Sequence, residues 1–463
     1  MAIDTSDTIS NLLQNQRRYF HEGKTRSLDD RQRSLSHLRE VLIQYEPKLL
    51  EALHADMNKS AFEGYSTEVG FTLEEIKNAS KHLAKWAKPK RVKTPFIHFP
   101  ASSHIYTEPL GSVLIIGPWN YPFQLLFSPL VGALAAGNTA ILKPSELAPQ
   151  TSKIVAEMAA KELDPLLVAV VEGGGPETQR LLELRFDHIF FTGGGQVGRI
   201  VLAAAAKHLT PVTLELGGKS PCIVDKDTNW ELTARRIAWG KFLNAGQTCV
   251  APDYCLVPKG TAEDLARRLK ECVESFYGSD PSKSVDYGRI INDRHFSRLE
   301  GLLAERPGKL AFGGQTKPAE RYLAPTVLTE VRESTAIMQD EIFGPLLPIL
   351  EYESLGEAIQ FVNRRPKPLA LYFFSTSTDN QDRVLAQTSF GGGCINETLL
   401  HLGNPYLPFG GVGESGMGAY HGHDSFLTFS HRKGVLKKSF LVDVPIRYAP
   451  FGDKLRVVKR VLG

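Results

Sequence analysis

Cys249 is the residue whose surroundings point most clearly to chemistry. It follows the short polar turn Gly246-Gln247-Thr248. Free cysteine is usually a buried packing residue, but a thiol after such a turn can be reached by a substrate and flanked by backbone N–H groups. Upstream, Glu215 places a carboxylate among leucines and glycines. A cysteine nucleophile and a semi-buried carboxylate base are the parts of covalent catalysis, so these two segments favour an enzyme over a purely structural protein.

Further short motifs accompany these two segments in a fixed order. They are Gly117-Pro118-Trp119-Asn120-Tyr121-Pro122, Leu142-Lys143-Pro144-Ser145-Glu146, Phe191-Thr192-Gly193, Glu341-Ile342-Phe343-Gly344-Pro345 and Pro408-Phe409-Gly410-Gly411-Val412-Gly413-Glu414-Ser415-Gly416. With these motifs, from near residue 110 to near residue 434, the chain resembles the aldehyde dehydrogenase superfamily. The run from Cys249 to Tyr254 and the tail Gly418-Ala419-Tyr420-His421-Gly422 are similar to its class 3 branch.

The resemblance implies NAD(P)-dependent oxidation of an aldehyde to a carboxylic acid. The thiolate of Cys249 attacks the aldehyde, and the Asn120 amide with the Cys249 backbone N–H stabilises the thiohemiacetal oxyanion, each donor contributing ~3–4 kcal/mol. Glu215 then activates the water that hydrolyses the thioester, and its apolar neighbours are expected to raise its pKa toward the range of a general base. The alternative interpretation of Asn120 is an ordinary turn residue beside proline.

A glycine-rich segment predicts the cofactor site. Residues 193–198 match the dinucleotide fingerprint G-x-G-x-x-G between a strand-like run and the helix-like run 200–207. The fingerprint also expects an acidic residue about 20 positions on, which would make Glu215 a ribose ligand rather than a base. The family's loop instead has the form Gly-x-Thr-x-x-Gly. In this chain Gly195 replaces the threonine and Gly194 replaces the residue before it, so no side chain at these positions can contact the phosphates. Backbone N–H groups at the start of the helix can still face the pyrophosphate, and Gly193, Gly194 and Gly198 are assigned to this site.

The remaining cofactor contacts follow from the resemblance. Lys143 and Glu146 are expected at the adenine-side ribose, where the Glu146 carboxylate should repel a 2′-phosphate and favour NAD, with NADP also accepted. Glu341 and Phe343 are expected to hold the nicotinamide ribose and ring, and Trp119 belongs to the same site. An ion pair for Glu341 and core packing for Phe343 are the simpler alternatives.

An apolar tunnel around the aldehyde is predicted from Tyr121, Trp239, Leu243 and Phe409. Each alone is an ordinary core residue, but together they favour medium-chain, long-chain or aromatic aldehydes. Two other functions remain open. One is an acylating enzyme that passes the acyl group to coenzyme A, against which Glu215 argues. The other is a cysteine-dependent esterase or an inactive binding protein on the same fold, against which the set Asn120, Glu215, Cys249 and Glu341 argues.

The elements that position these residues are predicted by periodicity. Residues 8–90 are expected to be helical, with apolar positions at three- and four-residue spacing. From about 110, apolar runs at 113–116, 139–142, 168–171 and 188–191 alternate with helix-length segments, and runs at 254–257, 348–351 and 370–374 follow Cys249. This alternation predicts an α/β fold with parallel sheets covered on both faces, divided into two domains near Glu215.

The family's architecture gives these domains their expected bounds. Residues 1–90 and 108–215 form an NAD(P)-binding domain, residues 216–420 form a catalytic domain, and residues 91–107 with 421–463 form a bridging and oligomerisation unit. Because class 3 relatives form dimers, we expect a homodimer.

Composition narrows the partners and the location. The chain has 463 residues, 42% hydrophobic and 23% charged, with net charge +3, which suits a soluble globular protein and argues against a nucleic-acid binder. Five widely spaced cysteines argue against a disulfide framework or a zinc site, so no metal is expected and the other four are assigned to packing. The polar first 25 residues and the end Lys459-Arg460-Val461-Leu462-Gly463 lack a signal-peptide core and a hydrophobic anchor, which predicts a cytoplasmic protein with no transmembrane segment.

Overall fold

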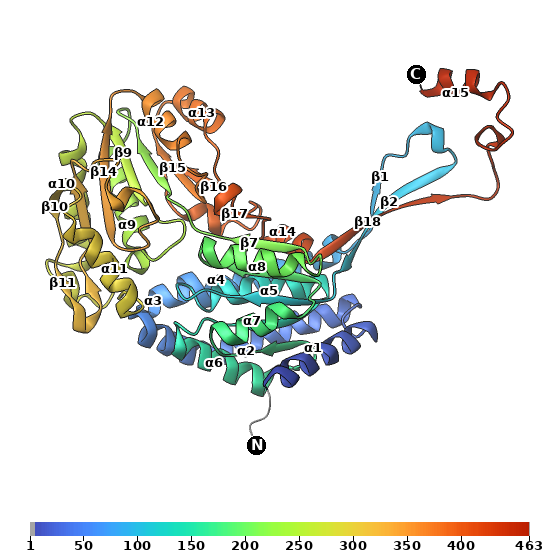
Figure 1. The fold of residues 1–463 in the computed structure, drawn as a ribbon, viewed down its shortest axis with the longest axis horizontal. Helices are drawn as coiled ribbons and strands as arrows, with labels where there is room; N and C mark the ends of the chain where they lie inside the picture. The colour runs from blue at the N-terminus through green and yellow to red at the C-terminus, as the bar shows by residue number, and fades with distance from the viewer. Residues whose placement is uncertain (1–4, 463) are drawn as a thin grey trace.

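The computed structural model describes residues 5–462, and its N-terminal part is helical as predicted (Figure 1). The helices are α1 (Thr5–His21), α2 (Leu28–Met57), α3 (Ala61–Gly64) and α4 (Gly70–Trp86), with a π-helical turn at Tyr65–Val69 between the last two. Helix α2 begins where the Ser27 side chain accepts a bond from Asp30 N–H, and it ends at the left-handed residue Asn58.

A six-stranded sheet follows in the order β17-β7-β6-β3-β4-β5. Its strands are β3 (Ser112–Ile116), β4 (Thr139–Lys143), β5 (Val168–Val170), β6 (His188–Thr192), β7 (Val212–Glu215) and the antiparallel edge strand β17 (Gly416–Met417). The intervening helices are α5 (Gln124–Ala136), α6 (Pro149–Glu162), α7 (Gly175–Glu183) and α8 (Gly195–Ala206). Because β3 to β7 are parallel, their carboxyl ends meet at one edge, which brings Lys143, Thr192 and Glu215 to the same side.

A seven-stranded sheet forms the second α/β unit, in the order β10-β13-β14-β9-β8-β15-β16. The strands are β8 (Pro221–Val224), β9 (Tyr254–Pro258), β10 (Lys309–Phe312), β13 (Thr326–Thr329), β14 (Leu346–Tyr352), β15 (Ala370–Phe374) and β16 (Gly392–Ile395), and only β10 is antiparallel to its neighbour. Its helices are α9 (Trp230–Phe242), α10 (Ala262–Tyr277), α11 (Asp293–Ala304), α12 (Leu355–Asn363) and α13 (Thr378–Gln387). The expected α/β class with parallel sheets is confirmed, and each predicted apolar run is a strand.

A three-stranded antiparallel sheet extends from the body as an arm (Figure 1). It consists of β1 (Lys90–Val92), β2 (Ala101–Pro109) and β18 (Ser430–Lys438), which follows α14 (Gly422–Thr428) and leads to α15 (Lys454–Leu462). The arm therefore joins the two segments assigned to a bridging unit, although β17, from the segment assigned to the catalytic domain, pairs with β7 of the first sheet. Residues 1–4 and 463 of the expected domains lie outside the described residues.

The two sheets share one hydrophobic core. Val113 and Phe190 of the first sheet belong to the same buried cluster as Tyr254 and Leu371 of the second. Packing through this cluster fixes the facing edges of the two sheets relative to each other. Within residues 5–462, no helix is both long and apolar enough to cross a bilayer.

Candidate active site

Cys249 lies at the end of a strained loop between α9 and β9. Asn244, Ala245 and Gly246 are all left-handed, with φ values of 53°, 50° and 73°. A side chain at Gly246 is excluded, since its Cβ would lie 2.3 Å from the Gly344 carbonyl oxygen. Such strain persists only where surrounding contacts hold it, and it is concentrated at functional sites.

The buried side chain of Gln247 supplies much of that support. Its Nε2 donates to the carbonyl oxygens of Asn244, at 3.0 Å, and Arg289, at 2.9 Å, while its Oε1 accepts from the Ile291 N–H at 3.0 Å. Gln247, in the polar turn before Cys249, therefore supports the structure of the loop.

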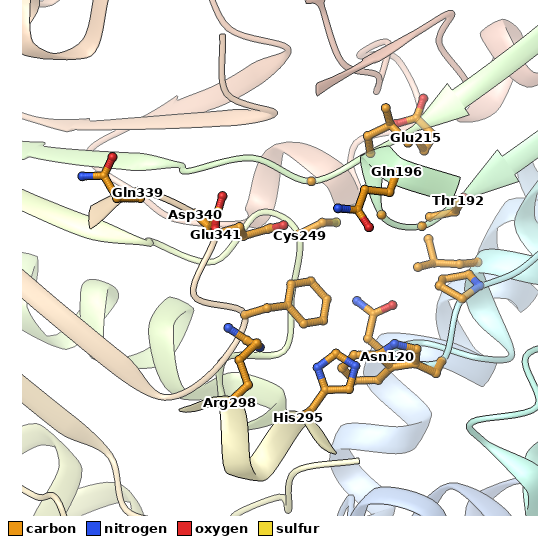
Figure 2. A pocket seen from close by; sticks show the side chains of 18 of the residues that line it. Asn120, Thr192, Gln196, Glu215, Cys249, His295, Arg298, Gln339, Asp340 and Glu341 are labelled. Atoms are coloured by element: carbon orange, nitrogen blue, oxygen red, sulfur yellow. The ribbon is translucent and has the colours of Figure 1, made fainter. Parts of the chain in front are cut away.

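Cys249 lines two cavities that meet at its position. One has a volume of about 760 Å³ and is also lined by Asn120, Glu215, Glu341 and Phe343; Figure 2 shows the side chains of Asn120, Glu215 and Glu341 around it. The other has a volume of about 430 Å³ and contains all four residues of the predicted tunnel, Tyr121, Trp239, Leu243 and Phe409. The thiol is thus accessible from a side rich in carboxylates and from a side rich in apolar groups.

Glu215 is a buried carboxyl without a partner. It ends β7, and neither carboxylate oxygen has a hydrogen bond within the described residues. Burial alone raises the pKa of Glu215 well above its usual value, because desolvation penalises the charged form. A buried carboxyl with no ion pair can act on a group that enters the cavity.

Glu341 is the second carboxyl of this cavity. Burial, reinforced by the charge of Asp253, raises the pKa of Glu341 to about 8, while a bond from the Gly218 N–H partly offsets the rise. Its position is set by the neighbouring residue Ile342, whose N–H donates to Asp253 at 3.0 Å and whose carbonyl accepts from Arg298 at 2.6 Å.

These carboxyls also affect the nucleophile. Burial and then the charges of Glu341 and Glu215 raise the pKa of the Cys249 thiol, which N–H groups at Cys249 and Val250 counteract. Cys249 is therefore a thiol at neutral pH, and a role as nucleophile would require transfer of its proton to a base. Glu215 and Glu341 are the titratable groups whose charges act on it.

Asn120 is bonded to the loop that carries Cys249. Its Nδ2 donates to the Gln247 carbonyl at 3.1 Å, and its own carbonyl accepts from the Asn244 Nδ2 at 2.9 Å. The next residue, Tyr121, bonds through its hydroxyl to Thr248 Oγ1 at 2.6 Å. The side-chain amide of Asn120 is therefore held in the cavity that Cys249 lines.

A third cavity, of about 1030 Å³, extends along the carboxyl edge of the first sheet and is lined by Lys143 and Glu146. It shares Pro118, Trp119, Thr192, Gly193 and Gly194 with the cavity at Cys249. Helix α8 begins between these cavities, with Gly194 as its N-cap and no atom within 4 Å of a Cβ placed there. The result is a long groove with exposed backbone N–H groups at its centre, which fits a dinucleotide whose pyrophosphate faces the helix N-terminus.

The two ends of this groove are lined by different side chains. At one end the Lys143 ammonium bonds to the Pro144 carbonyl at 2.7 Å and lies 3.6 Å from Glu146. At the other end the rings of Trp119 and Phe343 meet edge to face, with centroids 5.2 Å apart. Glu215 lines only the end at Cys249, which does not suit the ribose-ligand interpretation of the fingerprint.

Gly198 has a packing reason to be glycine. A Cβ on this residue would lie 2.8 Å from the Leu216 side chain, because α8 packs closely on the end of β7. The glycine-rich segment thus brings the first turn of the helix close to the strand that carries Glu215.

Several residues of the site had no signal in the sequence. His295 and Arg298 of α11 line the cavity at Cys249. Lys59, Glu63 and Glu68 come from the N-terminal region, from the turn after α2, from α3 and from the π-helical turn Tyr65–Val69. Glu63 lines the apolar cavity, and burial raises its pKa to about 7. Helical periodicity marks such positions as breaks in an apolar face but does not show what they contact.

A cysteine between a groove that fits a dinucleotide and an apolar cavity indicates a cofactor-dependent oxidoreductase. The aldehyde dehydrogenase family model matches residues 2–435. The chain belongs to the aldehyde dehydrogenase family.

Named relatives cover almost the whole chain. A 4,4′-diaponeurosporen-aldehyde dehydrogenase of Staphylococcus aureus is 50% identical over 95% of this chain and 96% of its own. A dimeric NADP-preferring aldehyde dehydrogenase of Rattus norvegicus is 49% identical over 97% of this chain and 99% of its own. Family 3 member B1 of Mus musculus is 49% identical over 98% and 97%, which confirms the resemblance to the class 3 branch.

The fold agrees with that of a solved relative. The substrate-bound structure of Staphylococcus aureus AldH is 48% identical, covers 100% of both chains and superposes with a TM-score of 0.96. The chain is therefore an aldehyde dehydrogenase that oxidises aldehydes with NAD(P), as the motifs predicted.

Proposed function

We propose that the reaction proceeds through a thiohemiacetal and a thioester on Cys249, with water activated by Glu215. The observation that carries this proposal is the position of Cys249 between the carboxylate-lined and the apolar cavities. An aldehyde in the apolar cavity places its carbonyl at the thiol, and the Asn120 side-chain amide and the Cys249 backbone N–H donate hydrogen bonds to the developing oxyanion. Bound NAD(P) supplies the hydride acceptor. Glu215 then takes a proton from water, which attacks the thioester and releases the acid and the thiol.

The proposed cofactor contacts extend along the groove. Lys143 and Glu146 hold the adenine-side ribose, and Gly193, Gly194 and Gly198 allow the pyrophosphate to approach α8. Glu341, Phe343 and Trp119 hold the nicotinamide half. The unpartnered hydroxyl of Thr192, which lines both parts of the groove, is a further candidate contact.

The substrates we propose are medium-chain, long-chain or aromatic aldehydes. Tyr121, Trp239, Leu243 and Phe409 surround the thiol on the substrate side, and burying each CH₂ of a substrate there contributes about 0.8 kcal/mol. The name of the Staphylococcus aureus relative gives 4,4′-diaponeurosporen-aldehyde as the aldehyde of that protein. On this basis kcat/KM should rise with chain length in a panel of aldehydes.

One assay separates this function from its alternatives. Absorbance at 340 nm is followed with an aldehyde and NAD, with and without coenzyme A, and the product is identified. The proposal expects NADH and free acid without coenzyme A. A requirement for coenzyme A would indicate an acylating enzyme, and ester hydrolysis without NADH formation would indicate an esterase.

NAD is expected to support a higher kcat/KM than NADP. The Glu146 side chain is half exposed, at 51%, and lies beside Lys143, so its negative charge should oppose a 2′-phosphate at that end of the groove. Glu146→Gln should narrow the difference, measured as kcat/KM for each cofactor. The name of the rat relative states an NADP preference for that protein. A strong NADP preference of the unaltered enzyme here would mean that attraction of the 2′-phosphate by Lys143 exceeds its repulsion by Glu146.

The enzyme is expected to be a cytoplasmic homodimer whose subunits are joined by the arm. The arm leaves the body as a free three-stranded sheet (Figure 1), and β18 has an unpaired edge that a second chain can extend. Sedimentation at micromolar concentration should show a dimer, and deleting residues 430–462 should give a monomer. A stable monomer of the full chain would exclude the predicted dimer. Recovery of the enzyme in the membrane fraction would exclude the predicted cytoplasmic location.

A further inference from the structure

A buried ion pair, Lys59 with Glu68, contacts the segment that carries Asn120. The Lys59 ammonium is 2.5 Å from the Glu68 carboxylate, and both side chains are fully buried. Burying two charges costs several kcal/mol per ion, and an apolar pair of similar size would often be as stable. Stability alone therefore does not explain the pair, and its other contacts indicate what it holds.

Lys59 binds the segment that carries Asn120. Its ammonium donates to the Asn120 carbonyl oxygen at 2.9 Å and lies 4.1 Å from the centroid of the Tyr121 ring. With Glu68, these contacts account for every direction in which the ammonium can donate. Lys59 itself is fixed by the turn that ends α2, where its carbonyl bonds to the His54 ring at 3.0 Å.

Glu68 holds the other end of the same segment. Its second oxygen accepts from the N–H groups of Phe123, at 2.9 Å, and Gln124, at 3.2 Å. These groups begin α5, which has no side-chain cap of its own, so Glu68 provides the cap from a distant part of the chain. Glu68 belongs to the π-helical turn Tyr65–Val69, a distortion that often occurs at functional sites.

The turn from Asn120 to Gln124 is thus held between an ammonium and a carboxylate. From this turn, the Asn120 amide and the Tyr121 hydroxyl reach the loop of Cys249. A displacement of Lys59 would therefore move the proposed oxyanion donor, Asn120, before it moved any residue of the cofactor groove.

We propose that Lys59 and Glu68 are positioning residues that fix the Asn120 amide against the nucleophile loop and thereby set the rate of attack on the aldehyde. This inference rests on the proposed role of Asn120 as an oxyanion donor. Small displacements of a positioned group can cost about 10²-fold in rate. Because neither residue lines the cofactor groove, NAD affinity should be retained.

The test is a mutant cycle. The paired change Lys59→Met with Glu68→Gln removes both charges at similar volume and leaves no lone buried ion. In the unaltered background it should lower kcat/KM for the aldehyde by about 10-fold to 10²-fold, with Kd for NAD changed less than about 2-fold. In an Asn120→Ala background the same change should have almost no effect, because residues that act through one another are not additive.

The outcomes separate the inference from the function on which it rests. An equal loss in both backgrounds, or a loss matched by the fraction of unfolded protein, would overturn the positioning role. Full activity of Asn120→Ala alone would instead remove the proposed role of Asn120. If the paired variant does not fold, Glu68→Asp provides a second test, because it keeps the charge but shortens the side chain. It should lower kcat/KM for the aldehyde by a smaller factor, and this loss should also disappear in the Asn120→Ala background.

Discussion

Replacing Cys249 with alanine should remove aldehyde oxidation and leave cofactor binding intact. Loss of a covalent nucleophile costs about 10⁶-fold in rate. The groups proposed to hold the cofactor come from β4, α8 and the segment at Glu341, and none of them bonds to the sulfur within the described residues. NADH formation at 340 nm should therefore fall to the background, while NAD titration gives an unchanged Kd.

A matched control is available in Cys272, a partly exposed residue of α10 that lines neither cavity. Cys272→Ala should keep full activity. Substantial aldehyde oxidation by purified Cys249→Ala would mean that another residue is the nucleophile.

Glu215→Gln should separate hydride transfer from hydrolysis. If Glu215 is the base, the variant still forms the thiohemiacetal and transfers hydride, so the first turnover appears as a burst of NADH. The steady rate should then fall by about 10²- to 10⁴-fold, the usual contribution of general-base catalysis, while KM for NAD changes little. If Glu215 binds a ribose instead, NAD affinity falls and saturating cofactor restores the rate.

The pH dependence provides a second readout of Glu215. Burial raises the pKa of this carboxyl, so the protonated form, which cannot act as a base, persists to higher pH than in water. The steady rate of the unaltered enzyme should therefore rise with pH as Glu215 ionises. Glu215→Gln should lose that part of the profile, whereas Glu271→Gln, at an exposed position of α10, should keep it.

The positions of the proposed site residues could be predicted from the sequence because each lies in a short motif at the end of a predicted element. Glu215 ends β7, Lys143 ends β4, and the glycines follow β6, so the parallel sheet brings them to one edge. The tunnel residues were predicted only as a group, and the apolar cavity does contain them all.

The supporting groups could not be predicted because their contacts are distant along the chain. Lys59 bonds to Asn120 across 61 positions and Gln247 to Arg289 across 42, and neither periodicity nor spacing records such pairs. The left-handed backbone of Asn244 and Ala245 has no local signal either, since it is imposed by the surrounding packing. The literal glycine fingerprint assigned Glu215 a ribose role, whereas Glu215 lies with Cys249 and away from Lys143.

The central claim, an acyl group carried by Cys249 and released by Glu215, is tested most directly by intact-mass spectrometry of Glu215→Gln. The variant is mixed with NAD and an aldehyde, quenched after the burst and fragmented. The account predicts one added acyl mass per chain, located on Cys249, in an amount equal to the NADH released. Equal NADH with no adduct, or with the adduct on another residue, would contradict it.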